Sequence, residues 1–366
     1  MLMENVLYNS NKAIRYKELD ALRGIAALMV VFFHLTLNRT EFNTFFKYGT
    51  SGVDLFFIIS GFVIFMSLQN IKDGTDFIIN RAARLYPTYW ACVTFTFLLG
   101  LSYSIYQNTL DGIVQRLIQY LGNLTMFQFY LGIRDLDAPY WTLIIEMIFY
   151  IVMLLLFKLK WLKYLNIIGV VFCIITLLLT HCFWDFKLIK VIIFKIPLLQ
   201  FLPLFFAGTV FYKIYSGNQN IIVNYLIIIF CLLSQIMLFS YSGRSHMQIN
   251  HTEYSITLLA YFILFTLFVN KKLTFIVNKT TMFFGKISYA LYLGHQYISF
   301  SFIFPTFYKN LELNFWVVAF LIDLPIITCI AAIITYKIEI PYSKLMKKEL
   351  YRIKDWNSKK KVDNIC

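Results

Sequence analysis

Several charged and titratable side chains of this 366-residue chain stand inside long apolar stretches. Arg23 and His34 are eleven residues apart in the first stretch, and Asp20 lies one helical turn before Arg23. On a helix, about 100° and 1.5 Å per residue put Arg23 and His34 on nearly the same face, roughly 16 Å apart along the axis. That face would offer a cation and, deeper, a base for proton abstraction or covalent catalysis. A basic anchor plus a histidine hydrogen-bonded to another helix would explain the same pattern.

A pair of arginines, Arg81 and Arg84, precedes Pro87 and a further apolar stretch. Residues three apart share one face of a helix, and two neighbouring guanidinium groups suit a phosphate-rich ligand at a membrane surface. Basic residues that only anchor the cytoplasmic end of a span are the alternative interpretation.

A carboxylate, Glu146, lies about one and a half turns after Trp141 in another apolar stretch. An unpartnered carboxylate at that depth is too costly, so we expect Glu146 to have a partner or to carry a proton. Asp54 opens a stretch containing Ser60-Gly61, whose small side chains favour close helix packing.

Tyr289 and His295 stand near the end of the chain, where His295 is a further histidine within an apolar stretch. Packing alone could account for each of these residues singly. Together they would supply bases, acids and phosphate-binding cations to one helix bundle.

The composition of the chain indicates which class of protein positions these residues. Hydrophobic residues make up 59% of the chain, charged residues only 14%, and the mean hydropathy is +0.67. Soluble globular domains carry about 25% charged residues, so a soluble enzyme, a disordered protein and a disulfide scaffold are all excluded. The six cysteines form no CxxC pair, and neither a zinc site nor another metal site is expected.

An all-α bundle of about ten transmembrane helices is the predicted fold, because about 20 apolar residues span the hydrocarbon core. The amphipathic segment 113–131, broken by Gly122, is expected to be an interfacial or re-entrant helix. The predicted spans are 21–38, 52–68, 86–105, 141–157, 164–182, 196–214, 221–240, 254–270, 287–305 and 314–336.

The distribution of basic residues predicts the orientation. With the N-terminus inside, 24 of the 33 lysines and arginines fall on the inner side, so both termini are expected in the cytoplasm. This arrangement explains the net charge of +14 without nucleic acid as a partner. We divide the chain into a cytoplasmic segment 1–18, a membrane domain 19–340 and a basic cytoplasmic tail 341–366.

Five motifs in order resemble those of the acyltransferase-3 family, integral-membrane O-acyltransferases that decorate bacterial O-antigens, exopolysaccharides and other envelope glycans. The resemblance covers roughly residues 15–340, and Thr142 departs mildly from a serine in the family pattern. The motifs are Asp20-Ala-Leu-Arg23-Gly24 with His34, Gly52-Val53-Asp54 with Ser60-Gly61-Phe62, Arg81-x-x-Arg84-Leu-x-Pro87, Trp141-Thr142-Leu143 with Glu146, and Tyr289-x-x-Tyr292-Leu-x-His295.

This resemblance implies that His34 is the essential histidine, with Arg23 in the catalytic region, and that Arg81 and Arg84 hold a cytoplasmic acyl-CoA donor, acetyl-CoA foremost. It implies a stand-alone enzyme without an appended hydrolase domain, placed in the bacterial inner membrane. The acceptor would be a glycan or a lipid-linked glycan. Membrane lipids surround the protein, and self-association stays open.

Two questions of chemistry stay open at this point. His34 could act as a general base or form a transient acyl-histidine, and Asp20, Asp54 or Glu146 could fix its tautomer, as in a catalytic triad. The alternative class of protein is a polysaccharide or lipid-linked glycan exporter, in which the buried acids and histidines would relay protons.

Overall fold

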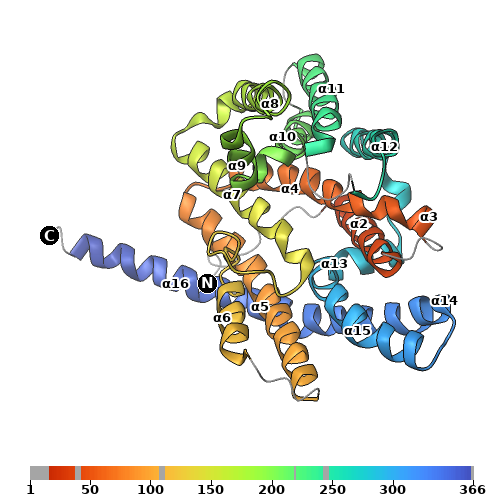
Figure 1. Ribbon diagram of the computed structural model, residues 1–366. Helices are drawn as coiled ribbons and strands as arrows, with labels where there is room; N and C mark the ends of the chain where they lie inside the picture. Colours follow the sequence, from red (N-terminus) through yellow and green to blue (C-terminus); the bar gives the residue numbers. More distant parts are fainter. Residues whose placement is uncertain (1–15, 38–42, 107–111, 218–219, 242–246, 364–366) are drawn as a thin grey trace.

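The structure is a computed structural model that describes residues 16–37, 43–106, 112–217, 220–241 and 247–363. These residues form helices and no strands (Figure 1). The principal helices are α2 (Lys17–Thr36), α4 (Gly52–Gln69), α5 (Gly74–Tyr106), α6 (Ile113–Asn123), α7 (Trp141–Lys158), α8 (Leu165–Cys182), α9 (Lys187–Lys195), α10 (Leu198–Tyr215), α11 (Ile221–Leu238), α12 (His251–Val269) and α13 (Lys279–Ile298).

The last part of the chain is one nearly continuous helical run. After α13, the π-helix η7 (Ser299–Asn310) leads to α14 (Phe315–Val317), η8 (Val318–Asp323), α15 (Leu324–Ile333), η9 (Ile334–Glu339) and α16 (Ile340–Asp363). Helix α16, which contains most of the basic tail, extends away from the bundle (Figure 1). The shorter elements are α3 (Asn43–Phe46), η1 (Lys47–Ser51), η2 (Ala138–Tyr140), η3 (Trp161–Tyr164), η4 (Phe239–Tyr241) and η6 (Thr274–Ile276).

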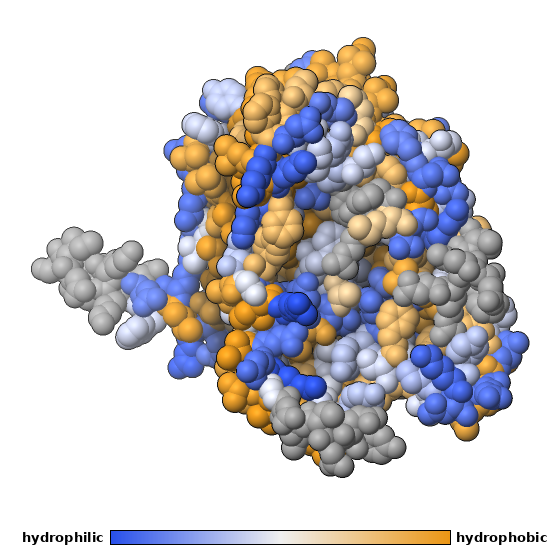
Figure 2. All heavy atoms as spheres, viewed as in Figure 1, coloured by the Kyte–Doolittle hydropathy of each residue, from blue (hydrophilic) through white to orange (hydrophobic). Residues whose placement is uncertain are grey.

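Nine helices of the described residues are long and apolar enough to cross a membrane, which confirms the all-α polytopic bundle. The predicted span 287–305 is helical, within α13 and η7, but it is not one of the nine. Polar residues inside this span, such as His295 and Gln296, lower its mean hydropathy. Large hydrophobic side chains are exposed along α8 and α11, at the top of the view in Figure 2, as expected of faces that contact lipid.

Helices α2 and α13 lie side by side and run in the same direction. A Cβ added to Gly24 would lie 2.6 Å from the Gly285 backbone nitrogen, and one added to Gly285 would overlap the Asp20 carbonyl oxygen. Ten residues beyond Gly285, His295 contacts His34. Helix α13 therefore follows α2 from the end of the bundle that contains Arg23, which we call the arginine end, to the end that contains His34, the histidine end.

Helix α4, which carries Ser60, is held against α10 by the close approach that Ser60-Gly61 predicts. A Cβ on Gly61 would overlap the Phe205 carbonyl oxygen of α10. The Phe205 ring stacks on Phe57 of α4 at 4.7 Å between centroids and lies 4.4 Å from Phe149 of α7. These contacts fix α4 and α7, the helices that carry Ser60 and Glu146, relative to each other.

Segment 113–131 lies along α5, a course that fits the interfacial or re-entrant helix that the sequence predicts. Three contacts hold this segment along α5. Arg116 donates to the Ser104 hydroxyl, and the Tyr120 hydroxyl lies 3.0 Å from the Thr94 hydroxyl. The Trp90 indole donates to the Leu124 carbonyl at 2.9 Å. From residue 104 to residue 90, α5 rises about 21 Å. The polar side of α6 faces the protein, and its exposed apolar residues are Ile113, Val114, Leu117, Ile118 and Leu121.

One helix is longer than its predicted span. The span was predicted over residues 86–105, but helix α5 begins at Gly74, and Pro87 lies inside it. Membrane helices tolerate an internal proline because neighbouring groups satisfy the freed carbonyls. Arg81 and Arg84 are therefore part of the same rigid helix as the span.

Candidate active site

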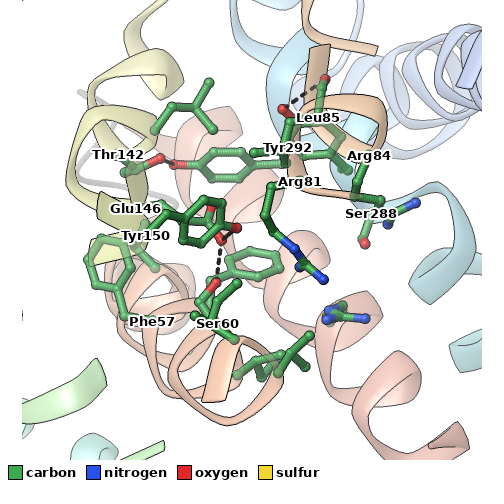
Figure 3. A pocket seen from close by; sticks show the side chains of 18 residues that line it. Phe57, Ser60, Arg81, Arg84, Leu85, Thr142, Glu146, Tyr150, Ser288 and Tyr292 are labelled. Carbon is green, nitrogen blue, oxygen red and sulfur yellow. Dashed lines mark hydrogen bonds between the residues drawn. The ribbon is translucent and has the colours of Figure 1, made fainter. Parts of the chain in front are cut away.

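A pocket between α2, α4, α5, α7 and α13 gathers most of the residues that the sequence singles out (Figure 3). It lies toward the arginine end of the bundle. Its polar lining consists of Arg23, Ser60, Arg81, Arg84, Thr142, Glu146, Tyr150, Ser288, Tyr289 and Tyr292.

Glu146 has the partners that its depth requires. Oε1 of Glu146 accepts hydrogen bonds from the Ser60 hydroxyl and, at 2.5 Å, from the Tyr150 hydroxyl one turn further along α7. Figure 3 shows the three side chains meeting on one side of the pocket, with the Arg81 guanidinium in the pocket beside them. Arg23 is also within electrostatic reach of Glu146.

The three arginines of the pocket differ in what neutralises them. Arg23 pairs with Asp20 at 3.3 Å, and Arg84 pairs with Glu339 of η9. Arg81 has no carboxylate partner among the described residues; it donates to the Ser67 hydroxyl at 3.3 Å and lies over the Phe77 ring. Arg81 is thus the cation of this pocket that an anionic ligand reaches without displacing an ion pair.

Glu339 is a functional candidate that sequence reasoning missed. It is buried, with 3% of its side chain exposed, whereas 48% of the Arg84 side chain is exposed. The available signal was a single carboxylate at the end of the last apolar stretch, two residues before Pro341. Sequence alone could not reveal its partner, since Arg84 lies 255 residues earlier.

His34 lies beyond the pocket, toward the histidine end. Tyr292 lines the pocket, its hydroxyl 3.0 Å from the Thr142 hydroxyl, and its ring contacts that of Phe56 at 5.5 Å between centroids. One turn after Tyr292, Nε2 of His295 lies 3.0 Å from Nδ1 of His34. The rings of Phe56 and Tyr292 therefore line the side of the pocket that is nearest to the two histidines.

No carboxylate proposed as a tautomer partner contacts His34, whose hydrogen-bond partners are His295 and the Val30 carbonyl. Asp54 faces Tyr254 of α12 instead, while Asp20 and Glu146 contact the groups described above. In the described residues, a second histidine stands where a carboxylate was expected.

Two further motif residues, Trp141 and Tyr289, contact neighbouring helices. Trp141 contacts the Phe201 ring of α10 at 5.9 Å between centroids, at the beginning of α7. Tyr289 lines the pocket and donates to the Leu85 carbonyl at 3.4 Å, which ties α13 to α5.

The fold and the buried site define a multi-pass membrane enzyme. A family model described as an acyltransferase domain matches residues 16–345, so the chain belongs to the acyltransferase-3 family. It is a membrane transferase that moves acyl groups other than aminoacyl groups.

Two relatives agree with this assignment. The chain is 25% identical over 280 residues to ORF330 of Acidianus two-tailed virus, provisionally named an acetyltransferase, with 75% of this chain and 80% of the relative covered. It is 31% identical over 116 residues to the exopolysaccharide production protein ExoZ of Rhizobium meliloti (strain 1021), with 29% and 34% covered. No solved structure shows a significant match.

Proposed function

We propose that this protein transfers an acyl group, acetyl foremost, from cytoplasmic acyl-CoA to a hydroxyl of a cell-envelope glycan, such as O-antigen or exopolysaccharide, in the inner membrane. The observation that carries the proposal is the pocket with three arginines, of which Arg81 has no carboxylate partner in the described chain. Coenzyme A is a polyanion, and guanidinium groups bind phosphates by paired, charge-assisted hydrogen bonds.

His34 supplies the chemistry. With the CoA phosphates near Arg81, the thioester would extend past Phe56 and Tyr292 toward the histidines. As a general base, His34 would take the proton of the sugar hydroxyl while its oxygen attacks the thioester carbonyl, and the C–S bond would break with release of CoA. As a nucleophile, His34 would first accept the acyl group and then pass it to the hydroxyl.

Two observations support the acceptor and the location. One relative, ExoZ, is named for exopolysaccharide production. The excess of basic residues on one side of the predicted spans fits a bacterial inner membrane with the arginine end in the cytoplasm, where acyl-CoA is made.

Purified protein in proteoliposomes, supplied with radiolabelled acetyl-CoA and envelope glycan from cells that lack the gene, tests the proposal. We expect release of free CoA thiol and label on the glycan, and mass spectrometry should find the same acetylation only in cells with the gene. An exporter would acquire and pass on no label. Absence of both label transfer and gene-dependent acylation would contradict the proposal.

A further inference from the structure

We infer that His295 is a positioning residue that holds His34 in the tautomer with a hydrogen on Nδ1 and a free lone pair on Nε2. The inference deepens the proposed function and rests on it only for the catalytic consequence. The tautomer itself is a property of the protein without substrate.

Backbone carbonyls determine the tautomer of His295. Its Nδ1 lies 3.1 Å from the Leu291 carbonyl oxygen and 3.0 Å from the Tyr292 carbonyl oxygen. Carbonyl oxygens only accept, so Nδ1 of His295 must carry the hydrogen. A neutral imidazole has one donor and one acceptor nitrogen, so Nε2 of His295 is an acceptor. The side chain is 1% exposed, which leaves no bulk water to exchange these roles.

The same reasoning then determines the tautomer of His34. Its Nδ1 lies 3.0 Å from Nε2 of His295 and 3.0 Å from the Val30 carbonyl oxygen. Both neighbours are acceptors, so Nδ1 of His34 carries a hydrogen that the two share. Nε2 of the neutral ring consequently holds the lone pair, and it makes no hydrogen bond to any residue that the structure describes.

This arrangement meets the need that a buried carboxylate meets in a catalytic triad, where the third residue orients the imidazole. When Nε2 of His34 takes the hydroxyl proton or the acyl group, the ring becomes positive and its Nδ1–H bond to Nε2 of His295 strengthens. The Nδ1 proton stays on His34, and His295 remains neutral. A neutral partner also avoids a permanent charge at this depth.

Solid-state NMR of ¹⁵N-histidine-labelled protein in lipid bilayers tests the tautomer directly. The chain has five histidines, and His34 is assigned by comparison with His34→Gln. We expect a protonated Nδ1 and an unprotonated Nε2 on His34 in the wild type. His295→Leu removes the acceptor and should leave a mixture of tautomers, whereas His251→Gln, at an exposed histidine bonded to the Ile236 carbonyl, should leave His34 unchanged.

Two conservative variants separate positioning from packing. Glutamine at 295 can place its amide oxygen near the position of Nε2, and asparagine reaches only to the position of Nδ1. We therefore expect His295→Leu and His295→Asn to lower kcat about 10- to 100-fold, the range found when the group that orients a metal-bound histidine is lost. His295→Gln should recover part of that loss, and KM for acyl-CoA should stay the same in all three.

Two results would overturn the inference: a hydrogen on Nε2 of wild-type His34, or an unchanged His34 tautomer in His295→Leu. Equal kcat in the Gln and Asn variants would remove the positioning role in catalysis. If the wild type transfers no acyl group but shows the expected tautomer, the proposed function fails while the assignment of the hydrogen-bonded pair stands.

Discussion

Arg81 differs from the other two arginines of the pocket in what faces it. Asp20 and Glu339 balance Arg23 and Arg84, but Arg81 faces the hydroxyls of Ser67 and Tyr150 and the Phe77 ring. A guanidinium group inside the pocket without a carboxylate is the strongest electrostatic reason for an anion to bind there.

Arg81→Ala should weaken acyl-CoA binding by at least about tenfold, because a hydrogen bond to a charged group is worth about 1.5–3 kcal/mol and 1.4 kcal/mol is a factor of ten. Isothermal titration calorimetry of the purified variant measures the effect. Arg352→Ala, at an exposed arginine paired with Glu349 on α16, is the matched control and should bind as the wild type does. Unchanged affinity in Arg81→Ala would remove this residue from the donor site.

His34→Gln should abolish glycan acylation while leaving acyl-CoA binding intact, because the arginines remain and a general base is worth about 10²–10⁴ in rate. Glutamine keeps a neutral hydrogen-bonding group of similar size but cannot take up the hydroxyl proton. Acyl transfer at matched protein levels in membranes measures the loss. Retention of most of the rate would make His34 a packing residue and move the catalytic role to His295 or Glu146.

The sequence singled out six of the polar or charged residues that line the pocket, but it did not show which residues they contact. Glu146 was expected to need a partner, and its depth explains why hydroxyls surround it. The contacts of Arg84 with Glu339 and of His34 with His295 join residues 255 and 261 positions apart. No local pattern encodes such pairs, because they depend on how α2, α5, α13 and η9 pack together.

Among the helices, the long apolar ones were predictable from hydropathy, and the exceptions have physical causes. The mean hydropathy of helix α13 is too low for it to count among the nine apolar helices, because α13 carries polar site residues on its buried face. Helix α5 begins earlier than its apolar stretch, since the helix continues through polar residues beyond the hydrocarbon core. Segment 113–131 was recognisable as amphipathic from its sequence, although its course along α5 was not.

Gly285→Ala should destabilise the protein and lower its activity, because the new methyl group would overlap the Asp20 carbonyl and push α13 away from α2. Overpacking of this kind costs about 1–3 kcal/mol. Gly294→Ala is the matched control on the same helix: its Cβ would have 3.9 Å to the nearest atom, Sγ of Cys92, and alanine favours helix by about 1 kcal/mol. Thermal unfolding in detergent should therefore show a lower Tm for Gly285→Ala only, and equal Tm values would refute the close contact.

For the whole molecule, the number of crossings decides on which side the C-terminus lies. Nine helices meet the hydropathy criterion, and an odd number of crossings would leave the two termini on opposite sides. Helix α13, however, follows α2 from the level of Asp20 to the level of His34, which is the passage of a tenth span. Ten crossings would return the chain to the side where it began, in agreement with the distribution of basic residues.

A C-terminal reporter fusion therefore distinguishes ten crossings from nine. We expect green fluorescent protein fused after Ile365 to fluoresce, and a phosphatase that works only in the periplasm to be inactive at the same position. The same two reporters after Phe183, where α8 ends on the opposite side in a ten-span protein, should give the reverse result. An active phosphatase and a dark fluorescent protein at the C-terminus would mean that α13 does not cross, and Arg81 and the basic tail could not then both face cytoplasmic acyl-CoA.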